Sequence, residues 1–326
     1  MAQPDFVASV RQRARALNRR LVLSEGGDAR VRGAAASVAA DGLAQVTLLG
    51  DAATRDWAAK SAPGVKVRIP AEDASLQKVA DLLKLRRPER AGDAAQARTM
   101  ASDPLRFAAG LVALGEADAT VGGAVHTTGD VLRAALWALG PAPGIATVSS
   151  SFYMITAPFG VLTFTDAGVV QYPTAEQLAD IALAAARDRK RIVGDEPRVA
   201  FLSHSTRGSA SGASIDKVRE ALARFRTLAA GIPADGELQA DAALVPEVAE
   251  RKAPGGILKG RANILVFPDL DSANIAYKLV QRIALATALG PIVQGLARPC
   301  CDLSRGASQD DIAQVSAIAI LQTDTP

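Results

Sequence analysis

Residues 198–228, RVAFLSHSTRGSASGASIDKVREALARFRTL, contain the pattern that decides the fold. The stretch opens on a short apolar run, residues 198–203, which is typical of a buried strand. It closes on residues 215–228, whose apolar side chains recur with a helical period, and a loop of serines and glycines joins the two. A strand that leads directly into a helix is the unit from which parallel sheets are built, because the chain must cross back before the next parallel strand.

The same alternation recurs along the whole chain. Seven further strand-like runs lie at residues 20–23, 45–49, 65–69, 119–121, 145–149, 161–165 and 263–267. Helical patterns cover residues 6–18, 73–85, 104–114, 130–139, 175–189 and 273–289. A capping box formed by Thr174 and Gln177 marks the start of one of these helices. The sequence therefore predicts an α/β protein with mainly parallel sheets covered by helices.

Length and composition suggest a globular protein of two domains. The 326 residues correspond to roughly two domains at about 150 residues each, and 49% of them are hydrophobic. The segment GPAPG at residues 140–144 is the best candidate for a boundary. The most apolar stretch, residues 283–297, is short for a membrane span and is interrupted by Gly290 and Pro291. We expect a cytoplasmic protein without a membrane partner.

The rarity of histidine and cysteine excludes several kinds of chemistry. The chain has two of each, and Cys300 and Cys301 are adjacent, so neither a zinc site nor a disulfide scaffold is expected. We interpret the two cysteines as small apolar filler. The basic residues are scattered and aromatics make up only 4%, which gives nucleic-acid binding little support. Catalysis must then depend on hydroxyls, carboxylates, arginines, backbone amides or the substrate itself.

Three loops that follow predicted strands could bind a ligand, because ligands of open α/β sheets sit at the carboxyl ends of the strands. The first loop, residues 121–130, is rich in glycine and includes Thr127 and Asp130, which are spaced as a capping box. Arg133 follows in the first turns of the helix, where a cation opposes the helix dipole and a bound anion would relieve the conflict. The alternative is a capped helix with a solvated arginine.

The second loop, residues 203–212, combines hydroxyls and glycines with Arg207 near a helix start, and it predicts an anion cradle. A flexible Ser/Gly loop is the alternative. The third loop, residues 302–312, places Ser304 and Arg305 in a turn before a capping box of Ser308 and Asp311. There the alternative is a purely structural Asp311. Asp28 follows the first strand and either caps a helix or takes part in catalysis, whereas Asp269 is predicted to cap a helix rather than to bind a metal.

Seven blocks in order along nearly the whole chain resemble the phosphate acetyl/butyryl transferase family. They lie at residues 18–26, 122–128, 173–178, 236–243, 263–271, 290–296 and 302–306. The resemblance implies two three-layer α/β/α lobes with a cleft between them, the first spanning residues 1–143 and completed by 293–326, the second spanning 144–292. It also implies a homodimer that interconverts acetyl-CoA and phosphate with acetyl phosphate and CoA. No metal takes part in the chemical step, and coenzyme A is a substrate rather than a bound cofactor.

The resemblance also assigns roles to residues. Ser304 and Arg305 match the pair that holds the acyl phosphate, Asp311 matches the proposed base for the CoA thiol, and Arg133 matches an anion-binding arginine. Either Arg86 or Arg87 matches the arginine that meets a CoA phosphate. Further substrate contacts are expected at Gly123, His126, Thr127, Thr128, Ser205, Arg207 and Gly208.

Three departures from the family pattern leave the acyl-chain preference open. Gly122, His204 and Cys301 stand where the family usually has Ser, Tyr and Asn. The alternatives are therefore a phosphate butyryltransferase and a non-catalytic acyl-CoA-sensing domain, although the chain keeps the matched site residues. A related β-decarboxylating dehydrogenase is disfavoured because no set of metal-binding carboxylates stands out.

The chemistry sets a condition on Asp311. An ordinary thiol has a pKa of about 8.5 and an aspartic acid about 3.9, a gap of roughly 6 kcal/mol for proton transfer. Asp311 is an effective base only where burial raises its pKa or positive potential lowers that of the thiol. A helix N-terminus shifts the pKa of Asp311 in the opposite direction.

Overall fold

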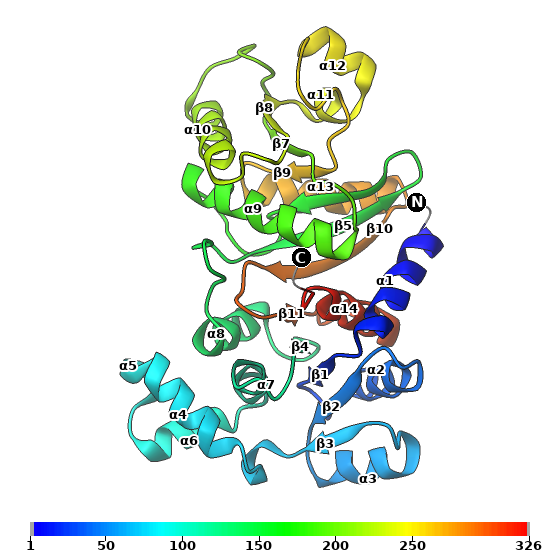
Figure 1. The fold of residues 1–326 in the computed structure, drawn as a ribbon, viewed down its shortest axis with the longest axis vertical. Helices are drawn as coiled ribbons and strands as arrows, with labels where there is room; N and C mark the ends of the chain where they lie inside the picture. Colours follow the sequence, from blue (N-terminus) through cyan, green and yellow to red (C-terminus); the bar gives the residue numbers. More distant parts are fainter. Residues whose placement is uncertain (1–2, 325–326) are drawn as a thin grey trace. The chain divides into compact units, whose positions relative to one another are not determined.

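A computed structural model describes residues 3–324, and the chain in it divides into two compact units (Figure 1). The terminal unit contains Val7–Ala142 and the residues from Leu296 onward. The central unit contains Pro143–Gly295 together with the first residues of helix α1. No helix among the described residues is both long and apolar enough to cross a membrane.

The terminal unit is built on a fully parallel sheet of five strands in the order β11-β4-β1-β2-β3. Its strands are β1 (Arg20–Leu23), β2 (Gln45–Leu49), β3 (Lys66–Arg68), β4 (Ala119–Gly122) and β11 (Cys300–Asp302). In register, Leu21 lies beside both Val46 and Ala119. Because all five strands run the same way, their carboxyl ends and the loops that follow them lie along one edge of the sheet.

Helices cover both faces of this sheet. They are α1 (Gln3–Leu17), α2 (Ala29–Ala40), α3 (Ala52–Ser61), α4 (Leu76–Arg86), α5 (Pro88–Ala91), α6 (Ala94–Ala101), α7 (Pro104–Ala113), α8 (Thr128–Ala138) and α14 (Gln309–Leu321), with a short 3₁₀ turn at Pro70–Glu72. Helices α2 and α14 pack together on one face, and α7 and α8 pack together on the other (Figure 1).

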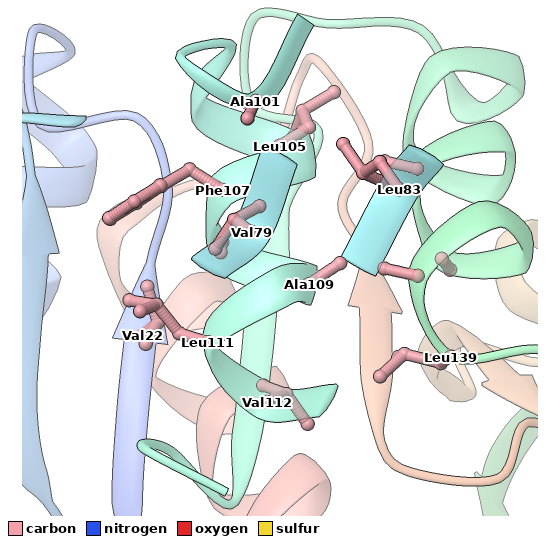
Figure 2. Close-up of a cluster of buried hydrophobic side chains, with 14 of the residues drawn as sticks. Val22, Val79, Leu83, Ala101, Leu105, Phe107, Ala109, Leu111, Val112 and Leu139 are labelled. Carbon is pink, nitrogen blue, oxygen red and sulfur yellow. The ribbon is translucent and has the colours of Figure 1, made fainter. Parts of the chain in front are cut away.

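Helix α7 lies at the centre of an apolar cluster of the terminal unit (Figure 2). Its residues Phe107 and Leu111 are almost completely buried, because α4, α6 and α8 surround the helix on the sides that do not face β4. A helix covered on most sides is expected to be largely apolar, and Arg106 is the one charged residue of α7.

The central unit contains a mixed sheet of six strands in the order β10-β5-β6-β9-β7-β8. Its strands are β5 (Ser149–Thr156), β6 (Gly160–Thr165), β7 (Val199–Leu202), β8 (Ala234–Leu238), β9 (Ile264–Val266) and β10 (Thr287–Gln294). Strand β5 is antiparallel to both β6 and β10, and the remaining pairs are parallel. Helices α9 (Ala175–Ile192), α10 (Ala213–Leu228), α11 (Ala240–Leu244), α12 (Pro246–Lys252) and α13 (Leu270–Ile283) complete the unit. Three of the five strand pairs are therefore parallel, as predicted, and the edge formed by β10 and β5 is antiparallel.

Several sequence predictions are confirmed. Strands β1 and β2 have the predicted bounds, and α1, α4, α7, α8, α9 and α10 lie where helical patterns were predicted. The capping box of Thr174 and Gln177 is complete, and Asp28 and Asp269 cap α2 and α13 by accepting from Arg30 N and Ser272 N.

Two element predictions are wrong. The helix predicted over residues 273–289 ends at Ile283, and β10 begins at Thr287 and pairs with β5. The apolar run continues past the helix, but Pro291 cannot donate a backbone hydrogen bond, and the register shifts between Leu289 and Ile292, as an edge strand permits. The strand predicted at residues 145–149 begins only at Ser149 and runs to Thr156, where the turn before β6 ends it.

Candidate active site

The carboxyl ends of β1, β4 and β11 form the candidate site of the terminal unit. The chain adds β2 and β3 on one side of β1 and adds β4 and β11 on the other, so the strand order reverses between β1 and β4. Loops diverge at such a reversal, and in open α/β sheets ligands bind there. We call the loops after these strands, residues 24–28, 123–127 and 303–308, the β1/β4/β11 site.

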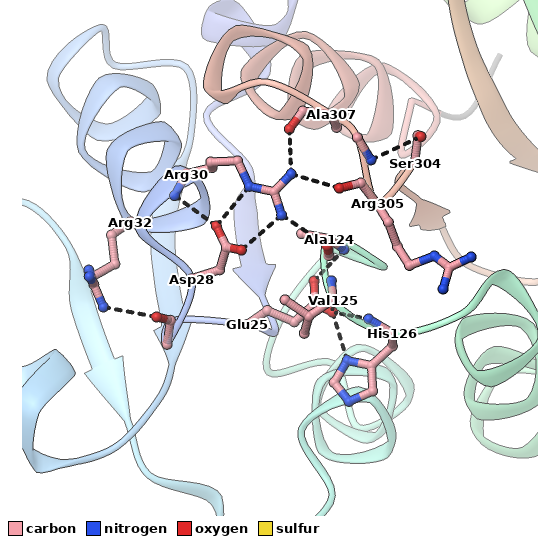
Figure 3. Close-up of polar contacts among 12 residues, drawn as sticks. Glu25, Asp28, Arg30, Arg32, Ala124, Val125, His126, Ser304, Arg305 and Ala307 are labelled. Carbon is pink, nitrogen blue, oxygen red and sulfur yellow. Dashed lines mark hydrogen bonds and ion pairs between the residues drawn. The ribbon is translucent and has the colours of Figure 1, made fainter.

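Glu25, directly after β1, holds the loop that follows β4. Its carboxylate is buried and accepts hydrogen bonds from the amides of Ala124 at 2.7 Å, Val125 at 3.1 Å and His126 at 3.1 Å (Figure 3). Nδ1 of His126 lies 2.7 Å from Glu25 Oε1. Because an ionised carboxylate only accepts, this contact places a proton on Nδ1 of His126 and fixes the orientation of the ring.

Arg30, in the first turn of α2, joins the loops after β4 and β11. Asp28 fixes its guanidinium through both carboxylate oxygens, and the Arg30 guanidinium lowers the pKa of Asp28. The same guanidinium donates to the carbonyl of Ala124 at 3.0 Å and to the carbonyls of Arg305 and Ala307, both at 2.8 Å (Figure 3). Arg30 thereby fixes the backbone of Arg305 without using the side chain of Arg305.

The Ser304–Arg305 turn presents two exposed side chains. Oγ of Ser304 accepts from the amide of Gly306 at 3.2 Å. Figure 3 shows the guanidinium of Arg305 extending away from the contacts made by its own carbonyl. The turn therefore offers a hydroxyl and a guanidinium to a ligand from a backbone that Arg30 holds still.

Asp302 ends β11 and reaches the start of α8. Its side chain is buried, and Oδ2 accepts from Oγ1 of Thr128 at 2.6 Å. Burial, reinforced by the charge of Glu25, raises the pKa of Asp302 to about 6. Gly123 lies against this carboxylate with a φ of +102°, and a Cβ there would overlap Asp302 Oδ1. Only glycine combines that backbone angle with that space.

Helix α8 begins beside this carboxylate. Thr127 caps it by accepting from the amide of Asp130, so the predicted cap is present. Arg133 is half-exposed and pairs with Asp130 at 2.8 Å, which satisfies part of its charge within the helix. The solvated arginine and the anion-binding arginine are both compatible with this placement, and the role of Arg133 stays a prediction.

Asp311 occupies the third position of α14 and completes its capping box. Its Oδ2 accepts from the amide of Ser308 at 2.9 Å and from the hydroxyl of Ser308 at 2.8 Å, and the residue is exposed. The structural role that the sequence allowed for Asp311 is therefore present. Its role as a base is untested and needs a second function for the same carboxylate.

Arg86 and Arg87 lie at the opposite end of α8 from Thr127 and Thr128. They donate to the carbonyls of Leu139 and Leu136, at 2.9 Å and 3.3 Å respectively. The 11 residues of α8 span about 16 Å, so these arginines are not beside the Ser304–Arg305 turn. Their predicted contact with CoA would involve a part of that long molecule remote from its thiol.

A carboxylate of the chain itself occupies the predicted anion-binding loop after β7. The carboxylate of Glu237 accepts from Oγ of Ser205 at 2.7 Å, from the amide of Gly208 at 2.9 Å and from Nε of Arg219 at 2.7 Å. Burial acts to raise the pKa of Glu237, but these donors lower it to about 2. Arg207 pairs with Asp235 at 2.6 Å. The loop is thus ordered from within, and its predicted contacts with substrate stay a prediction.

Two further expectations concern metals and cysteines. Within residues 3–324, no group of three or more His, Cys, Asp and Glu side chains is arranged to hold a metal ion. Cys300 and Cys301 are buried free thiols, and burial raises the pKa of Cys300 to about 12, which keeps it protonated and weakly nucleophilic. The interpretation of Cys300 as apolar filler agrees with this.

Comparison with known proteins identifies the family. The family model described as phosphate acetyl/butaryl transferase matches residues 5–320. A phosphate acetyltransferase from Paracoccus denitrificans is 47% identical over 319 residues, which cover 96% of this chain and 98% of that protein. The chain belongs to this family.

Two solved structures of similar proteins have the same fold. A phosphotransacetylase from Streptococcus pyogenes superposes with a TM-score of 0.94 at 37% identity, and the EutD phosphotransacetylase from Staphylococcus aureus with 0.92 at 35%. Each comparison covers 99% of both chains. The α/β fold class is therefore shared by these proteins over their whole length.

Two of the departures from the phosphate acetyl/butaryl transferase pattern have local explanations. A side chain at Gly122 would meet Oγ of Ser24 and Cδ2 of Leu105, so this chain has filled that space from neighbouring elements. The thiol of Cys301 donates to Oε1 of Gln322 at 3.2 Å, which links β11 to the end of α14. His204 is exposed, while Ser205 is buried, so the two do not form a catalytic pair.

The sequence did not reveal three residues that build this site. Glu25 and Arg30 act on loops about 100 and 275 positions away in the chain, and Asp302 acts on Thr128 from a distance of 174 positions. One signal was available for Glu25, because it directly follows a predicted strand. Nothing in the local sequence identified the partners.

We predict that Glu25→Gln loosens the loop after β4. The amide side chain cannot accept from all three backbone amides, so the free energy of unfolding should fall by about 1–3 kcal/mol. Hydrogen exchange at Ala124, Val125 and His126 should become faster. Glu72→Gln is the control, because Glu72 is exposed and its nearest cation is 3.8 Å away. Unchanged exchange at the three amides would contradict the role of Glu25.

Proposed function

We propose that the chain is a phosphate acetyltransferase that interconverts acetyl-CoA and phosphate with acetyl phosphate and CoA. Membership of the phosphate acetyl/butaryl transferase family makes the chain an acyltransferase. Support for acetyl as the group comes from its 47% identity to a protein named phosphate acetyltransferase. One observation assigns the reaction to a place in the fold. The backbone of the Ser304–Arg305 turn is fixed by Arg30, while both side chains of the turn stay exposed.

In this proposal the sulfur of CoA attacks the carbonyl carbon of acetyl phosphate directly. A C–S bond forms, the bond between the carbonyl carbon and the oxygen that bridges to phosphorus breaks, and phosphate leaves with that electron pair. Arg305 and Arg133 hold the phosphoryl oxygens, since a planar guanidinium matches them with two parallel hydrogen bonds. The hydroxyl of Ser304 and nearby backbone amides stabilise the oxyanion that develops on the carbonyl.

Asp311 takes the thiol proton in this scheme, and its placement limits what it can contribute. Its carboxylate is exposed and already accepts two hydrogen bonds from Ser308. One of its oxygens is therefore occupied by the capping box before any substrate binds. Positioning of the two substrates must supply much of the rate enhancement.

The proposal treats coenzyme A as a substrate, with no permanently bound cofactor and no metal in the chemical step. Arg86 or Arg87 would bind a phosphate of CoA, and Gly123, His126, Thr127, Thr128, Ser205, Arg207 and Gly208 would line the substrates' path. We also propose a cytoplasmic location, because the two cysteines are free thiols.

The direct test is the phosphate-dependent release of free thiol from acetyl-CoA, propionyl-CoA and butyryl-CoA. We expect the highest kcat/KM with acetyl-CoA and no release when phosphate is omitted. A preference for butyryl-CoA would assign the chain to phosphate butyryl transfer. Binding of acyl-CoA without release from any of the three would contradict the proposed function and favour a sensing role.

Single substitutions separate the roles of Asp311 and Arg133. We expect Asp311→Asn to lower kcat about 10- to 100-fold with little change in KM, because a base acts only in the transition state. Arg133→Ala should chiefly raise the KM for phosphate or CoA, because it removes ground-state binding. Asp310→Asn, one residue away and also exposed, is the matched control. Unchanged turnover in Asp311→Asn would remove Asp311 as the base.

We propose a homodimer that forms through α13. One face of this helix packs on β5, β6 and β10, while Ile275, Leu279 and Ile283, spaced four residues apart, are 59%, 52% and 77% exposed. Leu285, just beyond the helix, is 87% exposed. A contiguous apolar stripe on a helix indicates a protein interface, and a second copy is the commonest partner.

Substitution within this stripe tests the dimer. We expect Leu279→Glu to shift the molecular mass in solution, measured by light scattering, from two chains towards one. Gln281→Glu adds the same charge on another side of the helix and should leave the mass unchanged. A Leu279→Glu variant that stays dimeric would place the interface elsewhere.

A further inference from the structure

Asp302 contains a buried oxygen that its surroundings leave without a partner. The residue is 1% exposed, Oδ2 accepts from Thr128, and Oδ1 makes no hydrogen bond to any described residue. The chain satisfies a comparable carboxylate fully elsewhere. Asp166, 3% exposed, accepts from the amides of Ser150, Gly168 and Val170. Burying a half-satisfied carboxylate is unfavourable, so Asp302 calls for an explanation other than stability.

The position of Asp302 between two loops of the site supplies an explanation other than stability. It lies two residues before Ser304, and its bond to Thr128 reaches the first residue of α8, the helix that carries Arg133. A backbone bond from Leu303 to the carbonyl of Gly122, 2.9 Å long, runs alongside. These two bonds join the loop after β11 to the loop after β4 at the point where the proposed site residues diverge.

We propose that Asp302 is a positioning residue for acyl transfer, whose ionised carboxylate ties the start of α8 to the Ser304–Arg305 turn. In this way it fixes Ser304 and Arg305 relative to Arg133. The inference rests on the proposed function, because those three residues act on the substrate only there.

The negative charge is what distinguishes Asp302 from a neutral acceptor. An O–H···O⁻ hydrogen bond is shorter and stronger than a neutral one, and the 2.6 Å between Thr128 and Asp302 is in that range. The other titratable groups around it do not compensate the charge. Glu25 is itself anionic and is bonded to His126, and the buried thiol of Cys300 stays neutral.

This charge opposes folding at neutral pH. Burial raises the pKa of Asp302 from 3.8 in its ordinary surroundings to about 6, so the folded chain binds the proton more tightly than the unfolded chain. The contribution of Asp302 to stability is therefore greatest below about pH 4 and is lost as the pH rises through about 6. A residue kept for stability alone would show the opposite balance at neutral pH.

The experiment compares Asp302→Asn, Thr128→Val, Thr128→Ser and the double variant Asp302→Asn/Thr128→Val in the full chain. We expect Asp302→Asn and Thr128→Val each to lower kcat about tenfold with KM within about threefold of the unaltered chain. Thr128→Ser keeps the hydroxyl that donates to Asp302, so it should retain clearly more activity than Thr128→Val. The kcat of the double variant should be no lower than that of the less active single variant, because both substitutions remove the same hydrogen bond.

Two measurements separate this role from a structural one. The acid limb of the kcat/KM profile, centred near pH 6 in the unaltered chain, should flatten in Asp302→Asn. At pH 8, Asp302→Asn should melt at the same temperature as the unaltered chain or higher.

The outcomes also distinguish this inference from the proposed function. If the unaltered chain releases thiol with phosphate but Asp302→Asn keeps its kcat, only the role of Asp302 is overturned. Activity lost together with a lower melting temperature at pH 8, and not retained by Thr128→Ser, would likewise assign Asp302 a structural role. An unaltered chain that releases no thiol overturns both.

Discussion

The carboxylate of Glu25 is the interaction on which the candidate site depends. The loop after β4 turns sharply at Gly123, and its next three amides would point at a buried position without a partner. Glu25 accepts hydrogen bonds from all three, and it also fixes the ring of His126. Because Glu25 follows β1, the two strands between which the sheet order reverses are joined by one charged group. The start of α8, and with it Arg133, is placed by that loop.

In this arrangement the carboxylates and the arginines have different roles. Carboxylates are turned inward, where they satisfy backbone amides or fix a guanidinium, as Glu25 and Asp28 do. Arg305 and Arg133 remain exposed at the surface of the site. The central unit uses the same construction after β7, where Glu237 orders the loop of Ser205 and Gly208. Internal anions such as Glu25 and Asp28 hold the loops without contacting Arg305, whose guanidinium is left for a phosphate group.

The sequence predicts features whose causes are local and misses those whose causes are distant. Strands β1 and β2 were predicted to the residue because their apolar runs are short and bounded by polar residues. The capping boxes of α9 and α14 follow from partners that are three residues apart in the sequence. The acidic, glycine-containing β8 carries no strand signal, and it forms because β7 lies beside it. The site residues Ser304, Arg305 and Asp311 came from family resemblance. The roles of Glu25, Arg30 and Asp302 could not be predicted, because these residues meet their partners only in the folded chain.

The proposed mechanism requires that the Ser304–Arg305 turn, held by Arg30, binds the phosphoryl group. A crystal structure of the unaltered chain with saturating phosphate tests it most directly. We expect a phosphate ion bonded to the hydroxyl of Ser304 and the guanidinium of Arg305, with the contacts of Glu25 and Arg30 unchanged. Phosphate bound elsewhere, with the Ser304–Arg305 turn empty in the same crystal, would contradict it.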